Sequence, residues 1–74
     1  MEDKLQKIVA SVLGAQADRI TDDTSSDNFE TWDSLMHFQI ILAVESSYGV
    51  RFSSEMIPKL TSIAKIRNEI ERLT

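Results

Sequence analysis

Residues 33–49, DSLMHFQIILAVESSYG, decide the fold of this chain. The stretch carries helix signals at both ends. Asp33 and Ser34 are residue types that cap helix N-termini, and Gly49 suits the left-handed conformation that ends a helix. We therefore predict a helix from Ser34 to about Ser47, with either Asp33 or Ser34 as its cap.

The predicted helix is apolar on nearly all sides. The stripe that we expect to face the core consists of Leu35, Phe38 and Leu42, with Ile41 at its flank. A second stripe, rotated away from the first, consists of Met36, Ile40, Ala43 and Val44. Such a helix is either packed by neighbours on several sides or exposes an apolar patch to a partner or ligand. The sequence leaves both interpretations open.

The chain before this helix is predicted to form a first helix from about Glu2 to Leu13. Its apolar residues recur at helical spacing: Leu5, Ile8, Val9, Val12 and Leu13. Glu2 and Asp3 lie where the positive end of the helix dipole favours carboxylates, and Gly14 is a suitable stop. A long acidic loop, residues 15–33, follows, and long ordered loops are often functional. Its apolar residues that we expect to pack on the core are Ile20 and Phe29.

The segment after the second helix is predicted to contain two further elements. Ser53-Ser54-Glu55 begins a short helix of about one turn, which Pro58 ends. Thr61 or Ser62 caps a last helix. The apolar stripe of this helix consists of Ile63, Ile66, Ile70 and Leu73. The sequence thus predicts an all-α fold: a four-helix bundle with three main helices, a short third one and a long first loop, in a single domain over residues 1–74.

Composition excludes several classes of function. The chain has 74 residues, with 8 Lys plus Arg, 12 Asp plus Glu, one His and no Cys, and its net charge is −4. Without Cys there is no disulfide framework and no protein thiol nucleophile. The acidic balance argues against nucleic-acid binding, which needs a basic face. No signal peptide or membrane span is visible, so a cytoplasmic location is expected. The basic residues of the C-terminal half are expected on a solvated face: Arg51, Lys59, Lys65, Arg67 and Arg72.

Ser34 has two interpretations. A serine at the start of a helix is most often only a cap. The same position favours an anion, because free backbone N–H groups and the helix dipole attract a phosphate there. A phosphodiester on Ser34 would therefore lie in a favourable field, beside an acidic loop and an apolar helix.

The segment Asp33-Ser34-Leu35 resembles the Asp-Ser-Leu motif of acyl carrier proteins. Its context strengthens the resemblance, because the motif follows an acidic loop and opens an apolar helix that ends in Tyr-Gly-Val at residues 48–50. Residues 59–63, Lys-Leu-Thr-Ser-Ile, are similar to the entry of the family's last helix. The similarity extends over essentially the whole chain, and we interpret the chain as a discrete carrier.

The resemblance implies a cofactor, 4′-phosphopantetheine, which a phosphopantetheinyl transferase attaches to Ser34. It assigns Asp33 to contacts with the transferase and Mg²⁺ during loading. The arm ends in a thiol that carries an acyl group as a thioester. The residues that we assign to the partner or acyl-chain surface are Leu35, Met36, Phe38, Ile40, Val44, Ile57 and Leu60. No catalytic or metal-binding residue is expected.

Several positions depart from the family's pattern, among them Met36, Gln39, Ser46, Ser47, Trp32 and Pro58. Met36 and Gln39 stand where fatty-acid carriers usually have acidic residues. Because rim charges steer encounter and select partners, we expect partners that recognise a more apolar surface centred on Met36 and Ile40. Trp32 replaces a small residue before the motif, and we favour packing on the loop over contact with the arm. His37, one turn after Ser34, is expected to be solvated and without a catalytic role.

We interpret the chain as a non-catalytic, monomeric acyl carrier protein. It would deliver acyl groups to partner enzymes of lipid, polyketide or other specialised biosynthesis, and its partners are a transferase and the enzymes that load and accept the acyl group. One alternative is an aminoacyl or peptidyl carrier, whose second helix is typically less acidic. Another is an unmodified interaction domain of the same fold, binding a partner through Met36, Ile40 and Val44.

Overall fold

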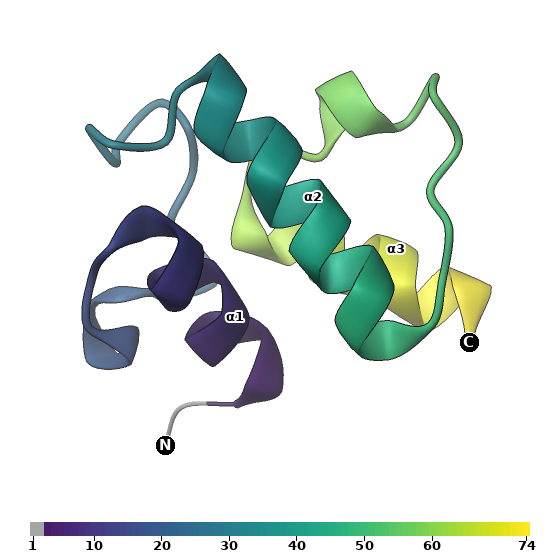
Figure 1. The fold of residues 1–74 in the computed structure, drawn as a ribbon, viewed down its shortest axis with the longest axis horizontal. Helices are drawn as coiled ribbons and strands as arrows, with labels where there is room; N and C mark the ends of the chain where they lie inside the picture. Colours follow the sequence, from purple (N-terminus) through teal and green to yellow (C-terminus); the bar gives the residue numbers. More distant parts are fainter. Residues whose placement is uncertain (1–2) are drawn as a thin grey trace.

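The computed structural model describes residues 3–74, which fold into three α-helices and two short 3₁₀ turns. In chain order these are α1 (Lys4–Leu13), η1 (Ala17–Arg19), α2 (Ser34–Tyr48), η2 (Ile57–Lys59) and α3 (Ile63–Leu73). Helix α2 runs through the middle of the view in Figure 1, with α1 on one side and α3 behind and beside it. The predicted all-α bundle is confirmed, and its short third helix is a 3₁₀ turn.

The ends of the helices follow the capping signals. The Asp3 carboxylate accepts a hydrogen bond from the Gln6 backbone N–H, and the Gln6 side chain accepts one from the Asp3 N–H. Gly14 and Gly49 end α1 and α2 with φ of 69° and 66°, the left-handed region that favours glycine. Ser62, the second of two predicted alternatives, caps α3. The predicted start of α1 at Glu2 lies outside the described residues.

The connection from α2 to α3 differs in one detail from the expectation. A turn begins at Ser53, whose carbonyl accepts hydrogen bonds from the N–H groups of Met56 and Ile57. Pro58 lies inside η2 near its first position and does not end it. Proline is tolerated there because the first N–H groups of a helix have no internal partner to lose.

The acidic loop is fastened to the N-terminus of α3. The N–H groups of Ile63 and Ala64 donate to the carbonyl oxygens of Thr24 and Asp22, at 3.0 and 3.2 Å. The Ser62 hydroxyl takes the next N–H, that of Lys65. All three first-turn donors of α3 are thus satisfied, two of them by the loop, which explains how so long a connection is held.

One apolar core joins the three helices and the loop. Its buried members are Leu5, Val9, Ala10, Leu13, Ile20, Trp32, Ile40, Ile41, Val44, Phe52, Leu60, Ile63, Ile66 and Ile70. Ile20 is fully buried, and Phe29 packs partly buried against the same cluster, so both predicted loop anchors are confirmed. Trp32 is also buried, which agrees with the packing interpretation.

The predicted core face of α2 is wrong for Leu35, Phe38 and Leu42, and only its flanking residue Ile41 is buried. Leu35, Phe38 and Leu42 are 64%, 53% and 50% exposed, whereas the opposite face buries Ile40, Ile41 and Val44 completely. Hydrophobic periodicity cannot choose between the two faces because both are apolar. The polar residues that share the exposed side of the helix, Gln39 and Ser46, were the available signal.

Arg67 connects three segments that are distant in the sequence. Its guanidinium lies 2.5 Å from the Asp3 carboxylate at the start of α1 and 3.0 Å from that of Asp22 in the loop. The hydrogen bond from the Gln6 N–H, together with the one from Arg67, holds the pKa of Asp3 below its ordinary value of 3.8. The hydrogen bond to Asp3 in turn raises the pKa of Arg67. Arg67 is therefore a structural residue, not part of a solvated face as predicted.

Candidate functional site

Ser34 is the exposed first residue of α2. The cap of this helix is Asp33, whose carboxylate accepts a hydrogen bond from the Met36 N–H at 2.9 Å. Of the two predicted caps the structure therefore selects Asp33, and the Ser34 hydroxyl is not needed for capping. An exposed hydroxyl at a helix N-terminus lies where the dipole and free N–H groups favour a phosphate.

Trp32, His37 and Ile57 form a chain of hydrogen bonds next to Ser34. The Trp32 indole N–H donates to His37 Nδ1 at 3.0 Å, and His37 Nε2 lies 2.7 Å from the Ile57 carbonyl oxygen. Because Nδ1 accepts, the proton of the neutral imidazole is on Nε2, which donates to the carbonyl. The indole and imidazole rings are stacked, with centroids 6.1 Å apart. His37 is thus half-buried and bonded on both sides, whereas the sequence indicated a solvated residue.

A pocket of about 440 Å³ opens beside Ser34. It lies between the N-terminal end of α2 and η2, which share one end of the molecule in Figure 1. Its lining residues are Ser26, Trp32, Asp33, Ser34, His37, Pro58 and Thr61. The pocket therefore joins the Asp-Ser-Leu segment to the turn that precedes α3.

The exposed face of α2 carries a row of apolar side chains and no charged one. Leu35, Phe38 and Leu42 recur on it at helical spacing, and Leu35 follows Ser34 directly. The single acidic residue of α2 is Glu45, whose carboxylate accepts a hydrogen bond from the Phe52 N–H at 2.7 Å. We call Leu35, Phe38 and Leu42 the exposed stripe.

The residues predicted as a partner or acyl-chain surface do not form one surface. Ile40, Val44 and Leu60 are buried in the core, Met36 and Ile57 are half-buried, and Leu35 and Phe38 are exposed. A partner surface centred on Met36 and Ile40 is therefore wrong, because Ile40 has no exposed area. The sequence missed Leu42, which completes the exposed stripe.

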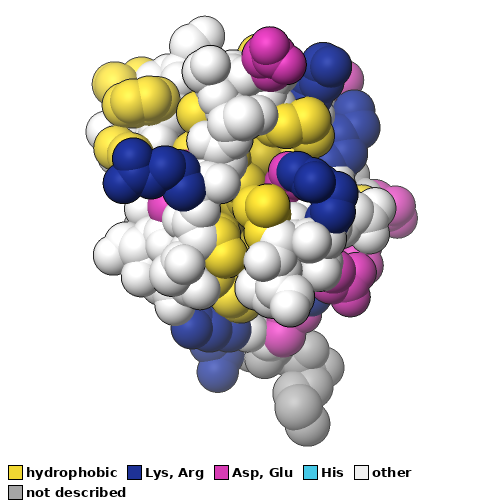
Figure 2. All heavy atoms as spheres, turned by 90° about the vertical axis from the view of Figure 1, so that its right-hand side faces the viewer, with side chains coloured by type: hydrophobic (Ala, Val, Ile, Leu, Met, Phe, Trp, Pro, Cys, Tyr) yellow, Lys and Arg dark blue, Asp and Glu magenta, His cyan; other side chains and the backbone are white. Residues whose placement is uncertain are grey.

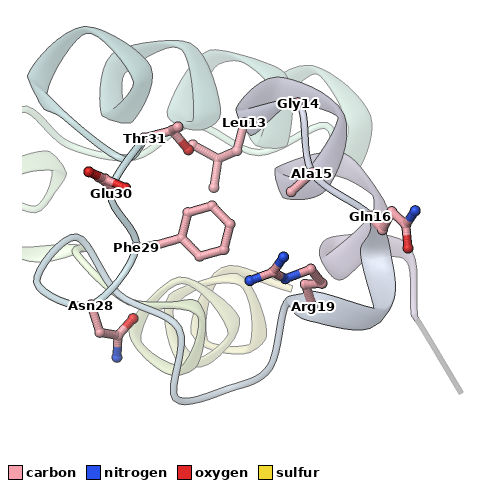
Figure 3. A pocket seen from close by; sticks show the side chains of 9 residues that line it. All are labelled: Leu13, Gly14, Ala15, Gln16, Arg19, Asn28, Phe29, Glu30 and Thr31. Carbon is pink, nitrogen blue, oxygen red and sulfur yellow. The ribbon is translucent and has the colours of Figure 1, made fainter.

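A different cavity, of about 580 Å³, lies between the end of α1 with the start of the acidic loop and residues 28–31 of the same loop. Figure 3 shows Phe29 directed into it, with Arg19 beside the ring. On the side of the molecule seen in Figure 2, apolar side chains reach the surface between groups of Lys and Arg. Ser34 is not among the residues that line this cavity.

Within residues 3–74, no three His, Asp or Glu side chains are grouped closely enough to hold a metal ion. No helix in the same range is long and apolar enough to span a bilayer.

Comparison with known proteins identifies the class to which this site belongs. Residues 3–70 match the family described as "Phosphopantetheine attachment site". The chain is 34% identical over 73 residues to polyketide-8 synthase acyl carrier protein 2 of Streptomyces avermitilis, covering 99% of this chain and 80% of the relative. It is 27% identical over 73 residues to an acyl carrier protein of Akkermansia muciniphila, covering 91% of that protein.

The chain therefore belongs to the phosphopantetheine-bearing acyl carrier proteins. Its cofactor is covalent 4′-phosphopantetheine, and its role is to carry acyl groups. The residues present fit this cofactor, because a phosphodiester needs a free, accessible hydroxyl and the Ser34 hydroxyl meets that need at a helix N-terminus.

Proposed function

We propose that Ser34 is the residue that carries the phosphopantetheine arm. The observation that carries this proposal is that the side chain of Asp33 caps α2, whereas Ser34 remains exposed. The helix N-terminus supplies a positive field for the phosphate. The arm's thiol holds the acyl group as a thioester, and it supplies the thiol that this Cys-free chain lacks.

Loading requires the Ser34 hydroxyl oxygen to bond to the phosphorus next to the pantetheine of coenzyme A. The bond to the second phosphate breaks, adenosine 3′,5′-bisphosphate leaves, and the hydroxyl proton is released. Asp33 is the chain's own carboxylate nearest in sequence to this oxygen, and we assign it a contact with Mg²⁺ and the transferase. One of its oxygens is occupied by the Met36 N–H.

The protein itself carries no catalytic activity in this proposal; it delivers acyl groups between enzymes. Its partners are a phosphopantetheinyl transferase and the enzymes that load and accept the acyl group. The uncharged exposed stripe favours partners of polyketide or other specialised biosynthesis over enzymes that recognise an acidic helix. We propose a monomeric, cytoplasmic carrier formed by a single domain over residues 1–74.

The test is intact mass before and after incubation with coenzyme A, Mg²⁺ and a broad-specificity phosphopantetheinyl transferase. The parent protein should gain one phosphopantetheine and Ser34→Ala should gain none. Ser46→Ala is the matched control, because Ser46 is an exposed serine of the same helix and its loss should leave loading unchanged. A gain that persists in Ser34→Ala would show that the assignment of the site is wrong.

Asp33→Asn separates the two tasks of Asp33. Asparagine caps helices about as well as aspartate, so the free energy of unfolding should change by only a few tenths of a kcal/mol. The rate of loading should fall at least tenfold, because the variant lacks the carboxylate proposed to contact Mg²⁺. Unchanged loading of a folded Asp33→Asn protein would limit Asp33 to a capping role.

The exposed stripe also supports a second candidate, an unmodified interaction domain of the same fold. An aminoacyl or peptidyl carrier is the other alternative. Failure of both a broad and a narrow transferase to load the parent protein would favour the interaction domain. Loading followed by acceptance of an aminoacyl group, but not of an acyl group, would favour the aminoacyl carrier.

A further inference from the structure

A further cavity of about 580 Å³ lies between α1 and the C-terminal half of α2, and we call it the α1–α2 groove. Among residues 3–74, none lines both this groove and the pocket beside Ser34. Ser47 lines the groove and follows Ser34 by 13 residues in α2 (47 − 34), which is about 20 Å along the helix axis. A ligand bound at the Ser47 end therefore lies far from Ser34.

The floor of the α1–α2 groove is apolar and accessible. Ile8 and Val12 lie one turn apart on the same face of α1, and Ala43 comes from α2. All three side chains are half-buried, so each keeps surface that faces solvent. They differ in this respect from the fully buried core residues Val9 and Val44. The groove thus offers apolar surface that a ligand can cover.

Positive charge borders this floor. Lys4 and Lys7 line the groove, and among residues 3–74 no acidic side chain lines it. The first 49 residues contain nine acidic and three basic residues, so two of these three basic residues lie at one place. Lys4 is also the first residue of α1, where the helix dipole disfavours a cation. A positive site at an unfavourable helix position, within an acidic half of the chain, indicates recognition of negative charge.

A hydrogen bond fixes one end of the groove. The Lys4 ammonium donates to the Ser47 carbonyl oxygen at 2.8 Å and lies 4.6 Å from the centroid of the Tyr48 ring. This contact fastens the start of α1 to the end of α2, so a ligand need not order this end. An ammonium group has three N–H donors, and two of those of Lys4 remain for a ligand. Lys7 is exposed and forms no ion pair within residues 3–74.

We propose that the α1–α2 groove binds an acidic amphipathic helix of a partner protein. The apolar side chains of that helix pack on Ile8, Val12 and Ala43, and its carboxylates lie at Lys4 and Lys7. An amphipathic helix in an apolar groove is a common mode of recognition. The inference goes beyond the proposed function and does not depend on attachment at Ser34. A partner bound in the groove raises the local concentration of the carrier at its enzyme and leaves the start of α2 uncovered.

The experiment is an NMR titration of the isotope-labelled full chain with stapled helical peptides. The acidic peptide carries leucines on one face and glutamates elsewhere. One twin has lysine in place of glutamate, and a second has serine in place of leucine. We expect nuclear Overhauser effects from the acidic peptide to Ile8, Val12 and Ala43, and an affinity at least tenfold lower for either twin. Absence of these effects at millimolar acidic peptide, or equal affinity for a twin, would overturn the proposal.

Lys7→Glu and Lys65→Glu are matched variants. Both replace an exposed lysine and change the net charge equally, but Lys65 lies on α3 and does not line the groove. Lys7→Glu should weaken binding of the acidic peptide at least tenfold, and Lys65→Glu less than twofold. The fold should persist in Lys7→Glu, since the dipole favours a glutamate near a helix N-terminus. Equal weakening would show non-specific attraction and would contradict the proposal.

Three further outcomes separate this proposal from others. The unloaded and the phosphopantetheine-loaded chain should bind the acidic peptide equally, so a failure of loading leaves the result unaffected. Binding only after loading would assign the contact to the arm and not to the groove. A second copy of the chain has the same net charge of −4, and a membrane is flat whereas the floor lies between two helices. We therefore expect a monomer in sedimentation equilibrium and no binding to phosphatidylglycerol vesicles. Self-association or vesicle binding that Lys7→Glu abolishes would assign the groove to that occupant instead.

Discussion

The two faces of α2 both carry large apolar side chains, but one face is buried and the other is exposed. One face buries Ile40, Ile41 and Val44 completely against α1 and the rest of the core. The other leaves Leu35, Phe38 and Leu42 at least half exposed, although they are as apolar as the buried residues. Burial of the second face would require another element that residues 3–74 do not supply. The exposed stripe begins directly after Ser34, which is why we associate it with partner enzymes and not with stability.

Charge is distributed in the opposite way. The exposed stripe has no charged residue, whereas the contact between α1, the loop and α3 is organised by Arg67 with Asp3 and Asp22. Charged side chains therefore stabilise the contact around Arg67, whereas the apolar side chains of the exposed stripe face solvent. The comparison predicts that replacing an apolar residue on the buried face of α2 changes stability. Replacing one of the exposed stripe should change partner recognition, and few replacements should change both.

The largest expected effect comes from the buried face. Ile40→Ala deletes a fully buried side chain and should lower the free energy of unfolding by about 2–5 kcal/mol. Leu42→Ala, on the exposed face of the same helix, should change it by about 0.5 kcal/mol or less. Urea denaturation followed by circular dichroism measures both. Similar losses in the two variants would mean that the stripe is covered in solution, for example by a second copy of the chain.

The next largest effect concerns partners. Phe38→Ser on the loaded protein should raise the KM of an acyl-loading enzyme about tenfold, because a central apolar anchor contributes most of the binding energy at an interface. The melting temperature should barely change, since Phe38 is more than half exposed.

Gln39→Glu is the control for this experiment. It restores an acidic residue on the exposed side without removing an apolar contact. We expect an unchanged KM for partners that recognise the apolar stripe. A KM that falls with Gln39→Glu and rises steeply with salt would instead identify partners that recognise acidic carriers.

Local signals predicted most of the fold. Helix ends depend on neighbouring residues, so Gly14, Gly49 and Ser62 could be identified from the sequence. The choice of buried face in α2 depends on where α1 and α3 lie, which periodicity does not contain when both faces are apolar. The same limit explains Arg67, whose two carboxylate partners lie 64 and 45 residues away in the chain (67 − 3 and 67 − 22).

In the candidate site, too, the features that depend on neighbouring residues were predicted, and the contact between distant residues was not. Ser34 and Asp33 were predicted because the motif is contiguous and opens a helix. The chain of hydrogen bonds through His37 was not, because Ile57 is 20 residues away and meets the imidazole only when η2 folds back over the start of α2. A histidine on a helix carries no sign in the sequence that its ring will be bonded on both sides.

The smallest expected effect tests the charged region that contrasts with the exposed stripe. The pKa of Asp3 lies below its ordinary value of 3.8, first because of the Gln6 N–H and then because of Arg67. A carboxylate whose pKa is depressed in the folded protein stabilises the fold at pH values above its ordinary pKa. This contribution is lost as the pH falls through the lower, folded-state pKa.

Asp3→Asn keeps a good cap and removes the charge, so it should lower the free energy of unfolding by about 0.5 kcal/mol at pH 7. The cost should diminish as the pH falls through the lowered folded-state pKa of Asp3, because the parent carboxylate is then protonated as well. Asp3→Ala, which also loses the cap, should cost about 1 kcal/mol more at pH 7. Thermal unfolding at pH 7 and at low pH distinguishes the two contributions, and a cost of Asp3→Asn that does not depend on pH would show that the ion pair with Arg67 adds nothing to stability.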